Sequence, residues 1–319
     1  MASVSAVGHA NMLSMASSPW FGVHTGLQRT STDELISLWK RIEELGFEWA
    51  SIWDHFYAAD GSGDPDCLEA VSCHAALAVT TERIRCGSLV YSAGYRHPAV
   101  LANAIATIDQ LSNGRAVLGL GGGWLEGEYQ AYGIPYGSPG ERLRRLGESI
   151  QCVQSLLNED RTNFEGEFFT MADAQCVPKP VQDHLPVWVG GGGEKVTLRV
   201  AAQYADGWNL PFISPEEWAR KSGILTAHCE DVGRDPKAVT RTVNVGIAKD
   251  DDDLRQQFDR IAEFVRPGVL MGEGQELVDR VGEYIDAGAE AVILAMRTPF
   301  DLEALDRFAE TVIPAFAAK

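Results

Sequence analysis

The sequence has few basic residues and no long apolar run. Its 27 Lys and Arg stand against 45 Asp and Glu, which gives a formal net charge of −18. No window approaches the roughly 20 consecutive apolar residues that a membrane span requires. Nucleic acids and anionic membranes are bound by a basic face, so both classes of partner are excluded. The acidity is typical of a soluble cytoplasmic protein whose partner is a small molecule.

Paired metal-ligating motifs are also absent. Six cysteines are scattered along the chain: Cys67, Cys73, Cys86, Cys152, Cys176 and Cys229. None forms a C-x-x-C pair, and no histidines cluster at ligand spacing, so we expect reduced thiols and no metal site. The segment Met1 to Ser18 has neither a cationic start nor a continuous apolar run. It is therefore predicted to be a disordered extension, not a secretory signal, with residues 19–319 as the folded domain.

What the sequence does contain is a regular alternation of strand-like and helix-like patterns. A chain of 319 residues that is 45% apolar could form two ordinary domains or one large α/β barrel. The predicted strands are 20–25, 49–53, 84–90, 116–118, 186–189, 206–210, 239–247 and 291–295. Helices are predicted between and after them, and Ser31 with Glu34 reads as a capping box. Eight strands with their helices, and no linker, predict a single (β/α)8 TIM barrel of the α/β class.

The predicted helices are 32–45, 67–79, 98–112, 141–157, 194–204, 215–232, 250–265, 276–287 and 302–316. One segment departs from the alternation, between the fourth and fifth strands. Residues 162–186 hold three prolines and no helical period, so we expect an excursion with a small hairpin there.

Two glycine runs follow predicted strands. Gly121, Gly122 and Gly123 precede Trp124, and Gly190 to Gly193 precede a predicted helix that starts at Glu194. Glycine leaves bare main chain that a planar or phosphorylated ligand can approach, and a helix start favours an anion. Neither run matches a dinucleotide fingerprint or a P-loop. Each run alone could be a tight turn, but two runs at strand exits favour a cofactor site.

In a barrel the chemistry lies at the carboxyl ends of the strands. The candidates at those positions are His24, Asp54, His55, Ser88, Leu89, Tyr91, Trp124, Gly190 to Gly193 and Asn209. Asp54 and His55 are neighbours in an extended segment, so their side chains should point to opposite faces and not form a direct pair. We expect His55 in the pocket and Asp54 in the loop. A histidine bonded only to backbone inside the barrel is the alternative for His55, and structural roles are expected for His24 and Asn209.

With these residues in place, the chain resembles the luciferase-like flavin and deazaflavin oxidoreductases, in particular the branch that uses coenzyme F420. The resemblance covers most of the chain from about Trp20. Its motifs are Leu45-Gly46-Phe47 with Trp53-Asp54-His55-Phe56, Tyr95 to Val100 with Leu111 to Arg115, Gly119 to Trp124, and Val189 to Gly193 with Ala205 to Asn209.

The resemblance implies that the tricyclic ring lies in the barrel mouth and the phosphate tail runs over glycine backbone. Gly190, Gly191, Gly192 and Gly193 then become phosphate-side contacts, and Gly121, Gly122 and Gly123 contacts along the ring or tail. A non-proline cis peptide behind the ring is implied at Ser88-Leu89. His55 matches the histidine that takes the substrate hydroxyl proton in the deazaflavin dehydrogenases, a task suited to an imidazole. A homodimer is also implied.

The chain departs from that pattern at three places. Ala58 and Ala59 stand where a tryptophan is expected, Trp124 where a glutamate is expected, and Gln28 near the position of another. Losing both carboxylates weakens the case for an alcohol-dehydrogenase mechanism, and Trp124 becomes either an apolar wall or a packing residue. The predicted function is an F420-dependent oxidoreductase acting on a small or medium, largely apolar substrate. An FMN-dependent monooxygenase using O2 is the alternative, followed by a non-catalytic flavin-binding barrel.

Overall fold

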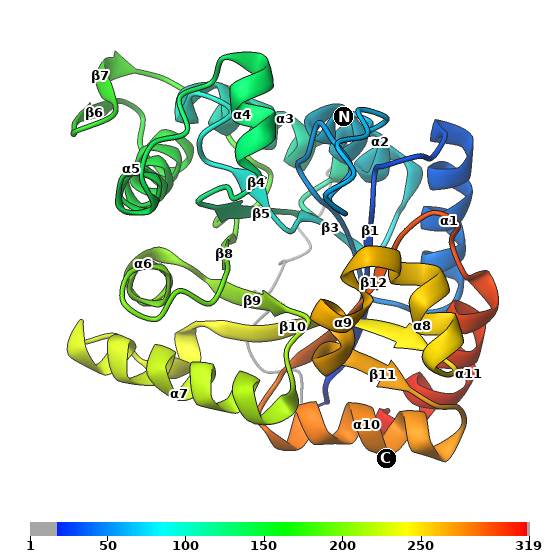
Figure 1. Cartoon of the computed structure of the whole chain (residues 1–319). Helices are drawn as coiled ribbons and strands as arrows, with labels where there is room; N and C mark the ends of the chain where they lie inside the picture. The colour runs from blue at the N-terminus through cyan, green and yellow to red at the C-terminus, as the bar shows by residue number, and fades with distance from the viewer. Residues whose placement is uncertain (1–17, 318–319) are drawn as a thin grey trace, which may run out of the picture.

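The computed structural model describes residues 18–317 of the chain (Figure 1). The predicted disordered extension, residues 1–18, lies outside the described residues except for Ser18. Within 18–317, no helix is both long enough and apolar enough to cross a membrane.

Eight parallel strands close into a barrel, as the alternating pattern predicted. They are β1 (Trp20–Thr25), β2 (Trp49–Ile52), β3 (Arg85–Ser88), β5 (Ala116–Gly121), β8 (Val187–Gly190), β9 (Gly207–Pro211), β10 (Thr240–Ala248) and β12 (Ala291–Met296). Each strand pairs in parallel with the next. The ring closes because β10 pairs with both β9 and β12, and β12 pairs with β1.

Helices form the outer layer of the barrel (Figure 1). They include α1 (Thr32–Glu44), α2 (Ala70–Thr80), α3 (Pro98–Ser112), α5 (Pro139–Asn158), α6 (Thr197–Tyr204), α7 (Pro215–Asp231), α10 (Gln275–Asp286) and α11 (Leu302–Phe316). Helix α1 begins at the predicted capping box: Glu34 N–H donates to Ser31 Oγ at 3.2 Å, and Ser31 N–H donates to the Glu34 carboxylate at 2.8 Å. Its buried face, with Leu38 and Trp39, packs into the main core.

Large indole rings fill the inside of the barrel. Trp49 of β2 and Trp188 of β8 come from different sides of the ring and stack with their centroids 4.7 Å apart. Glycines on the neighbouring strands make room for them. A Cβ at Gly87 would lie 2.4 Å from Trp49 Cζ2, and one at Gly207 would lie 2.4 Å from Trp188 Cε2. The alternation of very large and very small residues therefore packs the interior as a solid core.

The predicted excursion after α5 is present and contains the expected hairpin. Strands β6 (Thr162–Glu165) and β7 (Thr170–Ala174) pair antiparallel, apart from the barrel. In Figure 1 they project at the edge of the molecule beyond α5.

The structure corrects the predictions at the third strand and at helix α6. The third strand ends at Ser88, and the non-proline cis bond is Leu89–Val90, not Ser88–Leu89. The Ser88 hydroxyl accepts from the Gly119 amide and donates to the Gly119 carbonyl, so Ser88 stays bound to β5. The cis bond therefore lies one residue later than expected. Helix α6 begins at Thr197, not Glu194, because residues 194–196 form a turn.

The helix predicted over 250–265 is broken. It consists of α8 (Asp251–Phe258) and α9 (Ala262–Val265), separated at Asp259, whose φ of 43° is incompatible with a continuing helix. Three further elements were not predicted. They are α4 (Glu126–Tyr132), the short strand β11 (Val269–Met271), which pairs with β10, and the two-residue strand β4 (Tyr91–Ser92), which pairs with β5.

Candidate functional site

A cavity of about 660 Å³ opens at the carboxyl ends of the barrel strands. It is lined by residues of the strands and of the segments that follow them, all around the ring, including His24, His55, Leu89, Gly122, Gly191, Asn209, Asn244 and Arg297. The two glycine runs, which are far apart in sequence, therefore meet in one cavity. This is the arrangement that the sequence predicted for a single ligand.

Close packing against neighbouring side chains requires glycine at several positions of the cavity wall, apart from any need to let a ligand approach the backbone. Gly121, Gly122, Gly123, Gly190 and Gly191 line it. A Cβ at Gly121 would lie 2.6 Å from Val90 Cγ2, and one at Gly190 would lie 2.7 Å from Val90 Cγ1. Gly123 has φ +77°, in the region that favours glycine. At Gly121 and Gly190 the bare backbone thus follows from the close approach of β5 and β8 to the Val90 side chain.

Three predicted cofactor contacts do not line the cavity: Ser88, Gly192 and Gly193. The Ser88 hydroxyl is fully buried and used by Gly119. A Cβ at Gly193 would meet Thr197 Oγ1 at 2.6 Å, so this glycine serves the turn before α6. Leu89, together with Val90, does line the cavity.

His55 presents one ring nitrogen to the cavity. Its Nδ1 lies 3.0 Å from Glu128 Oε2, and its side chain is 13% exposed while that of Glu128 is fully buried. The carboxylate accepts the Nδ1 proton, so Nε2 is left with its lone pair and has no hydrogen-bond partner within residues 18–317. This is the tautomer that a general base requires.

Glu128 was not predicted as a site residue. It comes from α4 and also accepts the amides of Phe56 at 2.7 Å and Tyr57 at 2.8 Å, as well as the Tyr95 hydroxyl. Burial opposes its charge, but the bonds from His55, Tyr95 and the amides outweigh burial and hold the pKa of Glu128 below its usual value. Burial and the bond to Glu128 raise the pKa of Tyr95, which remains a hydrogen-bond donor. In the sequence Glu128 was visible only as part of an acidic segment.

Asp54 and His55 have different partners and form no direct pair. Asp54 accepts from Arg96 Nη1 at 2.7 Å, from Arg96 Nη2 at 3.0 Å and from the Ser92 amide at 2.9 Å. Burial raises the pKa of Asp54, although the bonds from Arg96 favour its charged form. These contacts tie the loop after β2 to the chain after β3, so Asp54 positions the loop that carries His55.

Two further predicted residues, His24 and Asn209, line the cavity, whereas Tyr91 does not. His24 Nδ1 is 2.9 Å from Ser51 Oγ, and burial, followed by the nearby charge of Arg297, lowers the pKa of His24 to about 3. His24 is therefore neutral at pH 7. Asn209 donates to Thr242 Oγ1 at 2.9 Å and to Asn244 Oδ1 at 3.0 Å.

Trp124 and Gln28 are two residues at which the chain departs from the family pattern, and only Trp124 lines the cavity. The Trp124 ring lies edge-on to His55 at 5.4 Å and lines the cavity, although it is 59% exposed. Gln28 does not line the cavity and accepts the Ala59 amide at 2.9 Å.

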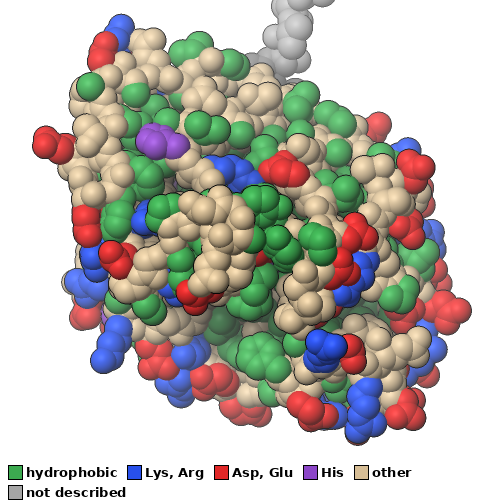
Figure 2. Space-filling view, turned by 45° about the horizontal axis from the view of Figure 1, so that its top comes forward, with side chains coloured by type: hydrophobic (Ala, Val, Ile, Leu, Met, Phe, Trp, Pro, Cys, Tyr) green, Lys and Arg blue, Asp and Glu red, His purple; other side chains and the backbone are tan. Residues whose placement is uncertain are grey.

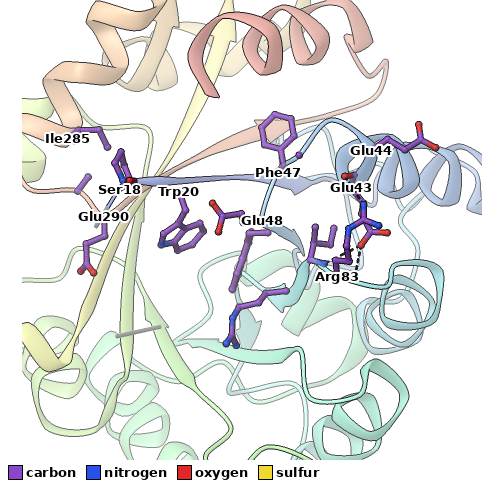
Figure 3. Close-up of a pocket in the computed structure, with 15 residues that line it drawn as sticks. Ser18, Trp20, Glu43, Glu44, Phe47, Glu48, Arg83, Ile285 and Glu290 are labelled. Atoms are coloured by element: carbon purple, nitrogen blue, oxygen red, sulfur yellow. Dashed lines mark hydrogen bonds between the residues drawn. The ribbon is translucent and has the colours of Figure 1, made fainter. Parts of the chain in front are cut away.

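A second cavity, of about 600 Å³, lies at the opposite end of the barrel (Figure 3). It is lined by residues at the starts of strands, among them Trp20, Trp49 and Arg85. Its carboxylate Glu43 is already bonded to the backbone amides of 82–84. Because barrel chemistry is carried by the carboxyl ends of the strands, we place the candidate site in the first cavity. Within residues 18–317, no group of His, Cys, Asp or Glu is arranged to hold a metal ion.

Known proteins share this architecture. The chain is 25% identical to an F420-dependent glucose-6-phosphate dehydrogenase of Amycolatopsis mediterranei, over 93% of this chain and 98% of the relative. It is 29% identical to an FMNH2-dependent dimethylsulfone monooxygenase of Pseudomonas putida, over 74% of this chain and 64% of the relative.

Among solved structures, an F420-dependent secondary alcohol dehydrogenase in complex with an F420-acetone adduct superposes with a TM-score of 0.85 at 19% identity, covering 94% of this chain and all of the other. This likeness concerns the fold. The family model described as luciferase-like monooxygenase matches residues 12–289. With its closed parallel barrel and its cavity at the carboxyl ends of the strands, this chain belongs to the luciferase-like monooxygenase family.

Proposed function

We propose that this chain is an F420-dependent oxidoreductase that moves a hydride between the deazaflavin and a small or medium, largely apolar organic substrate. The observation that carries the proposal is that His55 and residues from both glycine runs line one cavity. Two relatives described above are named for F420, one by sequence and one by fold, which supports the choice of cofactor.

The residues present fit such a group. The wall formed by Gly121 to Gly123 and Gly190 to Gly191 offers backbone without Cβ atoms, and Leu89, Val90, Leu143 and Met296 supply an apolar lining. We assign the ring and tail contacts to these glycines, with Trp124 at the edge. A bound deazaflavin supplies a ring carbon that accepts or gives a hydride and does not activate O2.

His55 handles the proton in this proposal. When a hydride leaves a carbinol carbon, the hydroxyl proton passes to His55 Nε2, and in the opposite direction Nε2–H returns it. Glu128 holds Nδ1–H and stabilises the imidazolium that forms. Asp54 and Arg96 keep the His55 loop in place. His55 and Glu128 therefore act as a pair in which only His55 reaches the cavity.

An FMN-dependent monooxygenase is the second candidate, because the relative from Pseudomonas putida is named for reduced FMN. Titration with oxidised F420 and with FMN, followed by ring absorbance, separates the two. We expect F420 to bind at least about tenfold tighter, a difference of about 1.4 kcal/mol. FMN binding of equal or greater strength would reject the cofactor assignment.

The role of His55 is tested with the best substrate from a panel of alcohols and ketones. His55→Ala should keep most of the F420 affinity and lose about 100-fold or more in turnover, since general base catalysis contributes about 10²- to 10⁴-fold. His97→Ala, at an exposed histidine, is the control. Tight F420 binding without turnover on any member of the panel would favour a cofactor-binding barrel. The homodimer implied by the resemblance remains a prediction, which light scattering would test.

A further inference from the structure

Among the described residues that line the cavity, Arg297 is the one Lys or Arg. It directly follows β12, and within residues 18–317 it forms no ion pair. Its buried Nε has no hydrogen-bond partner among these residues either. Buried cations are normally paired, because removing an ion from water is costly unless an opposite charge or acceptor replaces the water. The guanidinium therefore lacks its counter-charge.

Aromatic rings surround this guanidinium. Its Cζ lies 5.4 Å from the Trp53 ring centroid, 5.9 Å from that of Phe212 and 5.4 Å from that of Phe258. Rings attract a cation over their faces, but they offer no acceptor for the in-plane N–H fork. Burial lowers the pKa of Arg297 to about 10, so the side chain is charged at pH 7.

The carboxylates around the cavity are already engaged. Asp60 is the carboxylate whose charge acts on Arg297, but it accepts from Arg29 Nη1 at 2.7 Å. Asp54 is bonded to Arg96, and Glu128 to His55. His24 is the other titratable group facing Arg297, and it is neutral at pH 7. The described carboxylates are therefore not free to pair with Arg297, and an anionic ligand in the cavity would meet an unpaired guanidinium.

The position of Arg297 points to the substrate and not to the cofactor. In the ring of strands, β12 is four strands away from β5, which leads into the first glycine run, and so lies across the barrel mouth from it. His55 follows β2, midway in the ring between β12 and β5, and Trp53 contacts both Arg297 and His55, with its ring centroid 5.8 Å from that of His55. A substrate that spans from Arg297 towards the glycine wall thus passes the proton-handling residue.

We propose that Arg297 binds a single carboxylate on an otherwise apolar substrate, so that this protein acts on organic acids with an apolar body. One guanidinium matches one negative charge in a bidentate contact, and the surrounding rings suit an apolar body. A phosphate dianion would leave a second charge buried without a partner. The identification of the acid as the substrate rests on the proposed function, but the binding site does not.

The test uses acids paired with their neutral amides. Benzoate, phenylacetate and octanoate, each with its amide, are titrated into the cofactor-free protein by calorimetry. We expect at least one acid to bind about tenfold or more tightly than its amide. Arg297→Met should abolish this preference with little effect on the amide. Arg297→Lys should keep a weaker preference, because Lys retains the charge and loses the fork. Arg280→Met, at an exposed arginine, is the control.

Other results would overturn the proposal. No preference for any acid over its amide, or a preference that survives Arg297→Met, excludes a carboxylate at this residue. Weaker F420 binding in Arg297→Met, with acid binding unchanged, would assign the arginine to an anionic group of the cofactor. A wild-type protein that prefers acids but does not bind F420 would reject the proposed function and leave this site intact. Arg297→Met should also unfold at the same or a higher temperature than wild type, whereas a lower temperature would indicate a structural role.

Discussion

The hydrogen bond between Glu128 and His55 determines which nitrogen of His55 can act as a base. Glu128 uses one carboxylate oxygen for the amides of Phe56 and Tyr57 and the other for His55 Nδ1 and Tyr95. The first oxygen fixes the loop, and the second selects the tautomer. Only a carboxylate can accept hydrogen bonds at both oxygens. A glutamine, which has the same shape, would present its NH2 donor either to the amides of the loop or to His55.

We predict that Glu128→Gln lowers turnover by about 100-fold and leaves F420 affinity unchanged. The glutamine oxygen would continue to accept from the Phe56 and Tyr57 amides, so its NH2 group would face His55 Nδ1. His55 would then carry its proton on Nε2 and could not accept another. Hydride transfer followed by ring absorbance measures the effect. The control is Glu126→Gln, on the same helix but exposed. Wild-type turnover in Glu128→Gln would contradict this account.

The sequence indicated some of these residues and not others. His55 and the glycines stood out because they follow predicted strands, and a barrel brings strand ends together. Glu128 could not be found in this way, and Arg297 was not singled out although it follows the predicted strand 291–295. The burial of Glu128 depends on the short helix α4, which has no side-chain N-cap bond. Arg297 is notable only because nothing within residues 18–317 neutralises it, which is a property of the packed structure.

At the scale of single elements, close contact between strands controls where glycine is needed. A Cβ at Gly119, in the middle of β5, would lie 2.0 Å from the carbonyl oxygen of Ser88 on β3. That oxygen belongs to backbone and cannot swing away as the end of a side chain could. In contrast, a Cβ at Gly127 of α4 would meet nothing within 4 Å.

These two glycines make a matched pair for substitution. Gly119→Ala should lower the free energy of unfolding by about 2–3 kcal/mol or more, since overpacking forces the backbone to shift. Gly127→Ala should raise it by about 0.5–1 kcal/mol, because alanine loses less conformational freedom in a helix. Urea unfolding measures both changes. Equal effects of the two substitutions would show that the contact with Ser88 does not control this position.

The elements that were predicted correctly carry their own local signals. Helix α1 has a capping box and an apolar face, and the barrel strands are apolar runs bounded by turn residues. Those that were missed depend on tertiary contacts. Strand β11 is three residues long and exists by pairing with β10, and the break at Asp259 lies within a segment whose pattern is helical on both sides. Local pattern therefore predicts long elements better than short ones.

Over the whole molecule, acidic and basic side chains are interspersed. Figure 2 shows them mainly round the margin of one face, with apolar side chains gathered nearer its middle. The net charge of −18 produces repulsion at neutral pH that decreases as carboxylates are protonated. Buried histidines act in the opposite direction. Burial lowers the pKa of His24 to about 3 and that of His74 to about 4, from an ordinary value of 6.5.

We predict that these histidines make the fold sensitive to mild acid. Between pH 6.5 and about 4, the unfolded chain binds protons that the folded chain does not, so their contribution is fully present above pH 6.5 and is lost as the pH falls. The loss is on the order of several kcal/mol. His74 bonds Tyr91 Oη at 2.9 Å and the Cys86 carbonyl at 3.1 Å. His74→Gln should therefore be less stable than wild type at pH 7.

The difference between His74→Gln and wild type should shrink steadily towards pH 4, because glutamine has no proton to gain in the unfolded state. Urea unfolding at each pH, in constant high salt to screen the net charge, gives the two curves. Parallel curves for His74→Gln and wild type would mean that His74 takes up its proton in the folded protein, and that its buried position does not make the barrel sensitive to acid.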